Sequence, residues 1–430
     1  MKLNLQTIII AIFIGAGLLG ILVFSGIIPI GSSSNSNGGT VVLWGTATSD
    51  SMAAPVEYFN KINTTFTLKY VQKFPETFDQ DLLEALASGT GPDMFLLTND
   101  LAYKYSNKIY TIPYQSYPLA SFKNTFAGAG ETFLTSKGLL AFPISVDPLM
   151  MYYNRSILDT NSIVYPPAYW DDLNTMAPVL TKKDSSGKIT QSTVAMGQFT
   201  NITHAKDIIS TLFMQMGNPI VSEKSVGFSS DLASTEKNYN LDSVLKFYTT
   251  FADPLQSVYS WNQSLQNSSD AFSSEKLAFY FGYASELPIL VSKNPNENFS
   301  VAPMPQIKNS NSKLTFAHVT GVAISSASKN FNTAFTAASL MATGDFAASY
   351  AKATSTIPVR RDLLSVKNTD SFSPTFYSSA LYAKSWLDPS SDDTDNIFNV
   401  MVKGVLSNTM STDNAIKDAD AKLNLLFRQQ

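Results

Sequence analysis

The stretch LASGTGPDMFLLTND, residues 86–100, joins the end of a helix, a buried strand and a polar turn. Gly89 suits the left-handed conformation that ends many helices, and residues 91–93 then turn the chain. Four apolar residues follow and stop abruptly at the polar residues 98–100. The stretch therefore predicts a strand that crosses the core and brings three polar side chains to its far edge.

The segments before this stretch alternate between strand and helix. TVVLWGT (40–46) and FTLKYVQ (66–72) have strand patterns, whereas SMAAPVEYFNKINTTF (51–66) and TFDQDLLEALASG (77–89) have apolar residues at helical spacing. This order predicts a parallel sheet with right-handed crossovers. Because ligands of open parallel sheets bind beyond the carboxyl ends of the strands, residues 98–100 are expected at a ligand site.

Composition limits the function classes open to the chain. Its 430 residues are more than one hydrophobic core usually serves, so two domains or lobes are expected. The net charge of -4 and the lack of a basic run argue against nucleic-acid binding. No cysteine is present, which excludes disulfides and a cysteine nucleophile. The two histidines, His204 and His318, are far apart in sequence and predict satisfied polar groups rather than a zinc site; no cofactor is expected.

The N-terminal region has the pattern of a membrane anchor. Residues 8–30 carry no charge and, at about 1.5 Å per residue, are long enough to cross a bilayer core. We interpret residues 1–30 as an uncleaved transmembrane anchor, with a cleaved signal peptide as the alternative. Lys2 precedes the run and no basic residue follows it before Lys61, which places the body on the extracytoplasmic side of the cell membrane as a single-pass protein. The Gly-, Ser- and Asn-rich residues 31–39 predict a flexible linker.

Alternating strand and helix patterns continue through the rest of the chain. LLAFPISVDPLMMYYNRSIL (139–158) reads as two strand-like runs interrupted by internal prolines. KLAFYFGYASEL (276–287) and FAHVTGVAISSASKN (316–330) each predict a strand that ends in polar residues. The segment 411–427 predicts an amphipathic helix. No internal repeat is visible.

Several motifs stand in an order known from one protein family. They are TVVLWGT, LLEALASGTGPDMF, FPISVDPLMMYYNRSIL, YPPAYWDDL, KLAFYFGY, VAPMPQ, TGVAISSASKN, TIPVRRDLL and NAIKDADAKLNLLF. Over about residues 40–427, the sequence resembles the extracellular solute-binding proteins of ABC importers, in the family of maltose- and oligosaccharide-binding proteins. It departs from the family pattern at the N-terminus, where the usual lipid-anchoring cysteine is absent and the apolar span stands instead.

The resemblance implies an α/β fold of two lobes, the periplasmic-binding-protein-like fold of type II. Strand crossovers between the lobes would fall near residues 142–146 and 315–318, and one ligand would be clasped between the lobes. The implied division assigns residues 40–145 plus 317–354 to lobe 1, and residues 146–316 plus 355–430 to lobe 2.

The resemblance also implies a function. The protein is expected to capture a small polar solute, foremost a sugar or oligosaccharide, by hinge closure and to deliver it to an ABC permease. Peptides, polyols and other small polar solutes suit the same fold. We expect a monomer that works without a cofactor.

Candidate ligand-binding residues follow from strand ends and from the resemblance. The strand ends of lobe 1 supply five candidates: Trp44, Thr46, Thr98, Asn99 and Asp100. Asp100 and Asp147 also match positions where the family binds sugar hydroxyls with carboxylates, which form strong charge-assisted hydrogen bonds. Tyr283 and Glu286 follow a strand end where the family places stacking aromatics, although Ala284 stands where some members have an indole. Further candidates are Thr320, Ser355, Thr356 and Trp386.

Other conspicuous residues have structural interpretations. Asp93 is expected to cap the turn before its strand. Three aromatic residues are expected in the core: Tyr152, Tyr153 and Trp170.

Two other functions remain open. A glycoside hydrolase needs two carboxylates that flank one bond, and Asp147 and Glu286 are the pair that would have to meet across the cleft. A tethered receptor or adhesin would use the same clasp to signal to a sensor partner instead of a permease.

Overall fold

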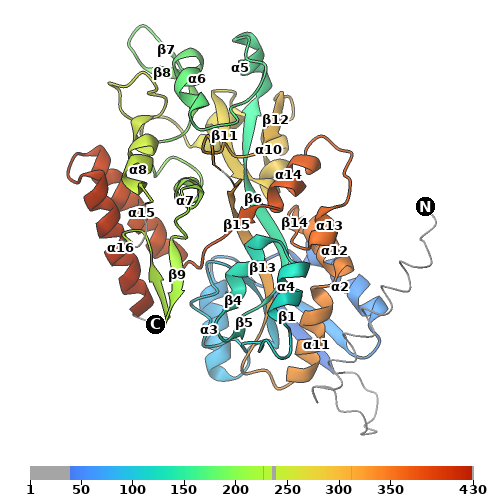
Figure 1. Cartoon of the computed structure of the whole chain (residues 1–430). Coiled ribbons are helices and arrows are strands. Elements are labelled where there is room, and N and C mark those ends of the chain that lie inside the picture. The colour runs from blue at the N-terminus through green and yellow to red at the C-terminus, as the bar shows by residue number, and fades with distance from the viewer. Residues whose placement is uncertain (1–38, 226, 235–238, 311, 429–430) are drawn as a thin grey trace.

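The computed structural model describes residues 39–428, except 226, 235–238 and 311. Strands occupy the centre of the molecule, and helices cover them in an upper and a lower lobe (Figure 1). The predicted two-lobed α/β fold is confirmed. Among the helices that the structure describes, none is long and apolar enough to cross a membrane. The predicted anchor, residues 1–30, and the predicted linker up to residue 38 lie outside the described residues.

The first lobe contains the predicted parallel strands. They are β1 (Thr40–Gly45), β2 (Thr67–Gln72) and β3 (Met94–Thr98), in the order β2-β1-β3. Helices α2 (Ser49–Ile62) and α3 (Phe78–Ser88) connect them. The alternation of strand and helix over residues 40–98 is therefore as predicted.

The turn before β3 also has the predicted geometry. Gly89 caps α3 in the left-handed conformation, with φ 70°. Asp93 is buried, and its carboxylate accepts hydrogen bonds from the backbone N–H of Val42 at 3.0 Å and the hydroxyl of Ser328 at 2.6 Å. Asp93 thus ties the start of β3 to β1 and to the loop after β13, which agrees with the structural role expected for it.

Two long strands, β6 (Phe142–Asn154) and β13 (Thr315–Ile324), belong to both lobes. β13 pairs with β3 through residues 320–324 and with the first half of β6 through residues 317–322. The second half of β6 pairs instead with β11 and β12 of the upper lobe. The crossovers were predicted near residues 142–146 and 315–318 of these strands, whereas β6 changes partner after residue 148.

The prolines of β6 do not interrupt it, so the expectation of two separate runs was wrong. Pro143 lies beside a shift in register between Thr320 and Gly321 of β13. Pro148 lies next to Leu149, where the pairing with β11 begins. Proline lacks the N–H that a regular ladder uses, and both prolines stand where the ladder is irregular or changes partner.

The upper lobe extends the sheet in the order β6-β11-β8-β7. β11 (Leu277–Tyr283) is antiparallel to β6 and parallel to β8 (Ile189–Val194), while β12 (Phe299–Ala302) pairs with β6. The other described elements before β13 are α4 (Leu119–Thr125), η1 (Gly128–Phe133), β4 (Leu134–Thr135), β5 (Gly138–Leu139), α5 (Arg155–Thr160), α6 (Asp172–Leu180), β7 (Lys182–Lys183), α7 (Ala205–Gln215), β9 (Val221–Lys224), β10 (Gly227–Ser230), α8 (Leu241–Thr250), α9 (Ser268–Ser273), η2 (Ala284–Glu286) and α10 (Leu287–Lys293).

The chain after β13 returns to the lower lobe and then crosses upward again. Its elements are α11 (Phe331–Met341), α12 (Gly344–Thr354), β14 (Ile357–Pro358), α13 (Arg361–Leu364), α14 (Ser373–Ala380), β15 (Ala383–Lys384), α15 (Ser391–Leu406) and α16 (Thr412–Arg428). The N–H of Ala127 donates to the carbonyl of Val359 at 2.9 Å, and α13 contacts α4. These contacts favour a boundary of lobe 1 later than residue 354; the division into lobes stays a prediction. β15 pairs with the start of β13, and the chain then reaches α15 and α16, which contact α8 of the upper lobe.

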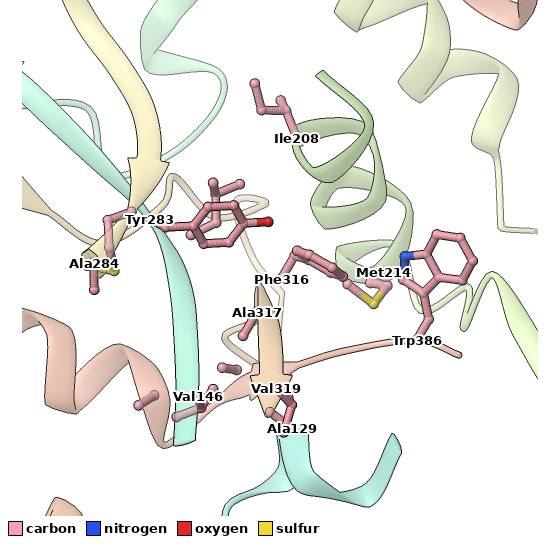
Figure 2. Close-up of a cluster of buried hydrophobic side chains, with 14 of the residues drawn as sticks. Ala129, Val146, Ile208, Met214, Tyr283, Ala284, Phe316, Ala317, Val319 and Trp386 are labelled. Carbon is pink, nitrogen blue, oxygen red and sulfur yellow. The ribbon is translucent and has the colours of Figure 1, made fainter. Parts of the chain in front are cut away.

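Buried apolar side chains of both lobes meet at the shared strands. Phe316 on β13 lies beside Met214 of α7, with Trp386 of the connection after β15 next to them, and Val146 on β6 lies near Val319 of β13 (Figure 2). Of the aromatics expected in the core, Tyr152 and Trp170 are buried, and Tyr153 is partly buried against the core.

Candidate functional site

A cleft between the lobes consists of two hollows that meet at the first turn of α15. Ser391 and Asp392 line both of them. The hollow on the side of lobe 1, about 380 Å³ in volume, is lined by Thr46, Pro75, Phe78, Asp79, Leu96, Thr98, Asp100, Leu101, Lys104, Thr320, Tyr350, Ser390, Ser391 and Asp392. The hollow on the side of lobe 2, about 550 Å³, is lined by Phe199, Thr200, Ile202, His204, Ala205, Lys206, Asp207, His318, Ser391, Asp392, Asp395 and Asn399. A larger hollow of about 640 Å³ lies beside Tyr165, away from the lower lobe's strand ends.

Four predicted residues come together in the lobe 1 hollow. Thr46 follows β1, Thr98 ends β3, and Asp100 lies just beyond it. Thr320 is the partner of Thr98 on β13. The Oδ1 atom of Asp100 is buried and has no hydrogen-bond partner among the described residues. The carboxyl ends of β1 and β3 therefore build this wall, as the strand-end rule predicts.

Trp44 and Asn99 do not line the cleft. Lys73 lies over the ring of Trp44, with Nζ 3.9 Å from the ring centroid. Asn99 is buried, and its Oδ1 accepts a hydrogen bond from the backbone N–H of Val319 at 3.1 Å. Neither residue is among those that line the two hollows.

Tyr283 lies behind the wall of the lobe 2 hollow rather than in it. Its side chain is 4% exposed, and its hydroxyl donates to Oδ2 of Asp207 at 2.7 Å. The ring centroid of Tyr283 is 4.6 Å from that of His204 and 4.7 Å from that of His318. Tyr283 thus supports three side chains that do line the hollow.

Glu286 has the same kind of supporting position. Its Oε1 lies 2.6 Å from Nε2 of His204 and accepts the N–H of Tyr283 at 2.8 Å, and its Oε2 accepts the hydroxyl of Tyr280 at 2.6 Å. Burial favours a higher pKa of Glu286, but the hydrogen bond and charge of His204 outweigh it and lower the pKa. Burial opposes the charging of His204, yet the hydrogen bond and charge of Glu286, with Asp207 and Asp147, raise its pKa. A carboxylate and an imidazolium therefore stabilise each other at the base of the hollow.

Asp147 lies on β6 close to this pair. Its Oδ1 accepts the N–H of Ser285 at 3.1 Å. Burial is the main cause that raises the pKa of Asp147 to about 6; the hydrogen bonds of Ser285 and the charge of His318 oppose it, and Glu286 adds to it. Neither Asp147 nor Glu286 is among the residues that line the two hollows.

The last three predicted residues lie away from the cleft. Ser355 is the left-handed C-cap of α12, with φ 56°. The hydroxyl of Thr356 is 2.8 Å from that of Thr354. Trp386 is 3% exposed, stacks on Phe398, and lines a different cavity.

Sequence reasoning missed several residues of the lobe 2 hollow. His204, Lys206 and Asp207 follow β8, a strand that was not expected, and His318 lies on β13. Both histidines have hydrogen-bond partners, as expected, but they also line the hollow. Recognition of ITQSTV (189–194) as a strand would have placed the loop after it at the ligand edge.

A buried ion pair fixes the point where the two hollows meet. Nζ of Lys206 donates to Oδ2 of Asp388 at 2.9 Å, to the hydroxyl of Thr394 at 3.0 Å and to the carbonyl of Ser391 at 3.1 Å. Asp388 also accepts the N–H of Ser390 at 3.0 Å. Lys206 therefore joins α7 to the first turn of α15. Within the described part of the chain, no group of three His, Asp or Glu side chains is placed to hold a metal ion.

A polar cleft at the strand ends of two lobes, with strands shared between the lobes, defines a ligand-binding clasp. The chain belongs to the family of bacterial extracellular solute-binding proteins, whose family model matches residues 54–374. The members of this family are binding proteins. A comparison with curated proteins found no match.

Solved structures with the same fold come from sugar-binding proteins. One is a cyclo/maltodextrin-binding protein complexed with maltotetraose (18% identity, TM-score 0.72, covering 91% of this chain and 98% of that chain). Another is the cyclic alpha-maltosyl-1,6-maltose binding protein from Arthrobacter globiformis (13% identity, TM-score 0.72, 92% and 100%). A third is the sugar-binding protein MalE from the phytopathogen Xanthomonas citri (14% identity, TM-score 0.69, 91% and 98%). At these identities the likeness shows the fold.

Proposed function

We propose that this protein binds a sugar or oligosaccharide in the cleft between its lobes. The observation that carries the proposal is a pair of buried side-chain oxygens, Oδ1 of Asp100 and Oδ1 of Asn399, which have no partner among the described residues. They line opposite hollows of one cleft. A ligand rich in hydroxyl groups supplies donors to both, and an unsatisfied buried acceptor is costly.

The proposed mechanism is hinge closure without a chemical step. Asp100 and Thr98 would bind the ligand from lobe 1, and His204 and Asp207 from lobe 2. A ligand that contacts both lobes binds the closed form better than the open form, and this difference in affinity shifts the population. The closed protein, a monomer, would then deliver its ligand to an ABC permease.

The proposal includes attachment to the membrane. The charge-free residues 8–30 would anchor the chain, with the folded body on the extracytoplasmic side. Mass spectrometry of the native protein should find the N-terminus intact. A mature start between residues 31 and 40 would show instead that the segment is a cleaved signal peptide.

Binding is tested by a thermal-shift screen of the full chain against neutral oligosaccharides, polyols, peptides and amino acids. The detergent should be of the polyoxyethylene type, because sugar-headed detergents would compete for the cleft. A ligand at about 100 times its Kd adds on the order of 2.7 kcal/mol to the free energy of unfolding. Stabilisation by peptides alone would refute the sugar assignment, and a hit that Asp100→Asn leaves unchanged would refute the site.

A further inference from the structure

A second cavity lies between the lobes, on the other side of the connection that leads from β15 to α15. Its volume is about 570 Å³, and it shares no lining residue with the cleft. Thr132 of η1 lines it from the lower lobe, and Ser222 of β9 from the upper lobe. Ser385 and Trp386 line it from the connection itself. Both lobes and the segment between them therefore contribute to its wall.

Four buried polar atoms in this wall have no hydrogen-bond partner within the described chain. They are Oγ1 of Thr132, Oγ of Ser222, Oγ of Ser385 and Nε1 of Trp386. The described residues contain nine such side-chain atoms in total, so nearly half of them gather at one cavity. Buried polar groups in folded proteins nearly always have a partner, and a cluster of exceptions needs an explanation.

The indole N–H of Trp386 is the most constrained of the four groups. The side chain is 3% exposed, and its ring stacks on that of Phe398 with centroids 6.4 Å apart. In Figure 2 the nitrogen edge of the indole faces Met214, which also lines the cavity. The donor is therefore held in place and shielded from solvent, beside a residue that lines the cavity.

The chemistry of the wall selects a class of ligand. Three hydroxyls can donate or accept, and the indole can only donate, so the ligand must offer hydroxyl groups and at least one acceptor oxygen. The charged residues of the lining, Glu131, Glu223 and Lys384, are exposed or only half-buried, so no buried charge awaits a charged ligand. Apolar side chains such as Met214 and Leu387 suit C–H groups.

We propose that this cavity is a second binding site, for a small neutral polyol or sugar no larger than a disaccharide. Cavities of this size with an apolar wall and a few fixed polar groups are typical ligand sites. The rim joins the lobes, because Glu223 accepts hydrogen bonds from the N–H of Ser136 at 2.8 Å and from its hydroxyl at 2.7 Å. A molecule bound here contacts both lobes and stabilises the arrangement of the lobes that the structure shows.

Sorbitol and trehalose are the probes, and the indole resonance of Trp386 is the reporter. The chain has four tryptophans, so ¹⁵N-tryptophan labelling of the full chain in a polyoxyethylene detergent gives four indole signals, assigned with Trp386→Phe. We expect a saturable shift of the Trp386 signal with at least one probe. Gluconate and glucamine, which share the carbon chain of sorbitol but carry a charge, should bind at least tenfold more weakly. A shift that stays linear with concentration for both probes, or equal binding of the charged analogues, would overturn the proposal.

Two kinds of variant separate this site from others. Thr132→Val and Ser385→Ala remove a hydroxyl at nearly constant volume and should weaken the Trp386 response at least fivefold. Ser273→Ala removes a buried hydroxyl on α9, away from the cavity, that also has no partner in the part of the chain that the structure describes. This variant should leave the response unchanged. Asp100→Asn impairs the cleft and should also leave it unchanged. If the Trp386 response is lost in Asp100→Asn but kept in Ser385→Ala, the response comes from the cleft and the second site is refuted. That outcome would leave the proposal of sugar binding in the cleft untouched.

Discussion

Nε2 of His204 and Oε1 of Glu286 lie 2.6 Å apart at the base of the lobe 2 hollow. The pair joins the start of α7 to the end of β11, and both side chains are more than three-quarters shielded from solvent. Since the partner raises the pKa of His204 and lowers that of Glu286, the pair is charged over a wide range of pH. His204 therefore keeps its proton to a higher pH than an ordinary histidine, and this proton is held where the ring lines the cleft.

Glu286→Gln should lower the pKa of His204, because the variant keeps the shape but loses the charge. The chain has two histidines, so an NMR titration with His318→Asn for assignment measures this directly. The contribution of His204 to stability is present below its ordinary pKa of 6.5 and is lost as the pH rises through the raised pKa. The contribution of Glu286 is present above its ordinary pKa of 4.5 and is lost as the pH falls through the lowered pKa. We expect the variant to lose about 1.5–3 kcal/mol of unfolding free energy near pH 5.5 and less at pH 8. An unchanged pKa of His204 would contradict the pairing.

Asp147 should make stability depend on pH in the opposite sense to most carboxylates. Its pKa is raised from 3.8 to about 6, so the folded state binds the proton more tightly than the unfolded state. The stability this contributes is complete below pH 3.8 and is lost as pH rises through about 6. Asp147→Asn should flatten the unfolding free energy between these values in urea titrations. A variant profile parallel to that of the wild type would show that Asp147 titrates normally.

Asp100→Asn and Asp93→Asn form a matched pair on the two ends of β3. Asp100 lines the cleft, and its Oδ1 has no hydrogen-bond partner among the described residues. Its variant should therefore lose about 1.5–3 kcal/mol of ligand-binding free energy and almost no stability. Asp93 is buried among three donors from two segments, so its variant should lose stability and keep affinity. Isothermal titration calorimetry and urea unfolding measure the two quantities. The same loss of affinity in both variants would indicate a general disturbance of β3.

Lys206→Met should be among the most destabilising single changes in the cleft. It leaves the carboxylate of Asp388, which is 2% exposed, without its cation, and loss of one partner of a buried pair costs about 3–5 kcal/mol. Asp388→Asn added to Lys206→Met should restore part of the stability. Lys293→Met, which breaks an exposed pair with Asp270, serves as the control and should cost about 0–1 kcal/mol. Equal losses in the two lysine variants, measured by urea unfolding, would show that burial of the Lys206 pair is unimportant.

The sequence predicted the local pattern of lobe 1 well because its strands are short, buried and separated by clear helix ends. Gly89 and the polar residues after β3 are local signals, so Thr46, Thr98 and Asp100 were placed at the cleft from strand ends. The prediction for β6 failed because prolines usually interrupt a strand. Here both prolines are accommodated because β6 has an irregular register or changes its neighbouring strand beside them. Those partners are far away in sequence.

The predictions for lobe 2 identified supporting residues instead of lining residues. Tyr283 and Glu286 are indeed at the end of β11, but the loop from β8 folds over them and brings His204 and Asp207 to the surface of the hollow. Trp386 was a candidate ligand-binding residue, yet it is buried and stacks on Phe398 of α15. Which of two polar or aromatic side chains covers the other depends on long-range packing, which residue spacing does not encode.

The position of β13 has a consequence for how the chain folds as it is made. β13 completes the sheet of lobe 1 by pairing with β3, although more than two hundred residues separate Leu97 from its partner Gly321. Until residue 324 has emerged, β3 has an open edge and β6 lacks a central neighbour. Contacts so distant in sequence form slowly, because a long loop must close first. Three-quarters of the polypeptide must therefore be synthesised before either lobe can reach its final structure, which leaves a long interval in which the chain is incompletely folded.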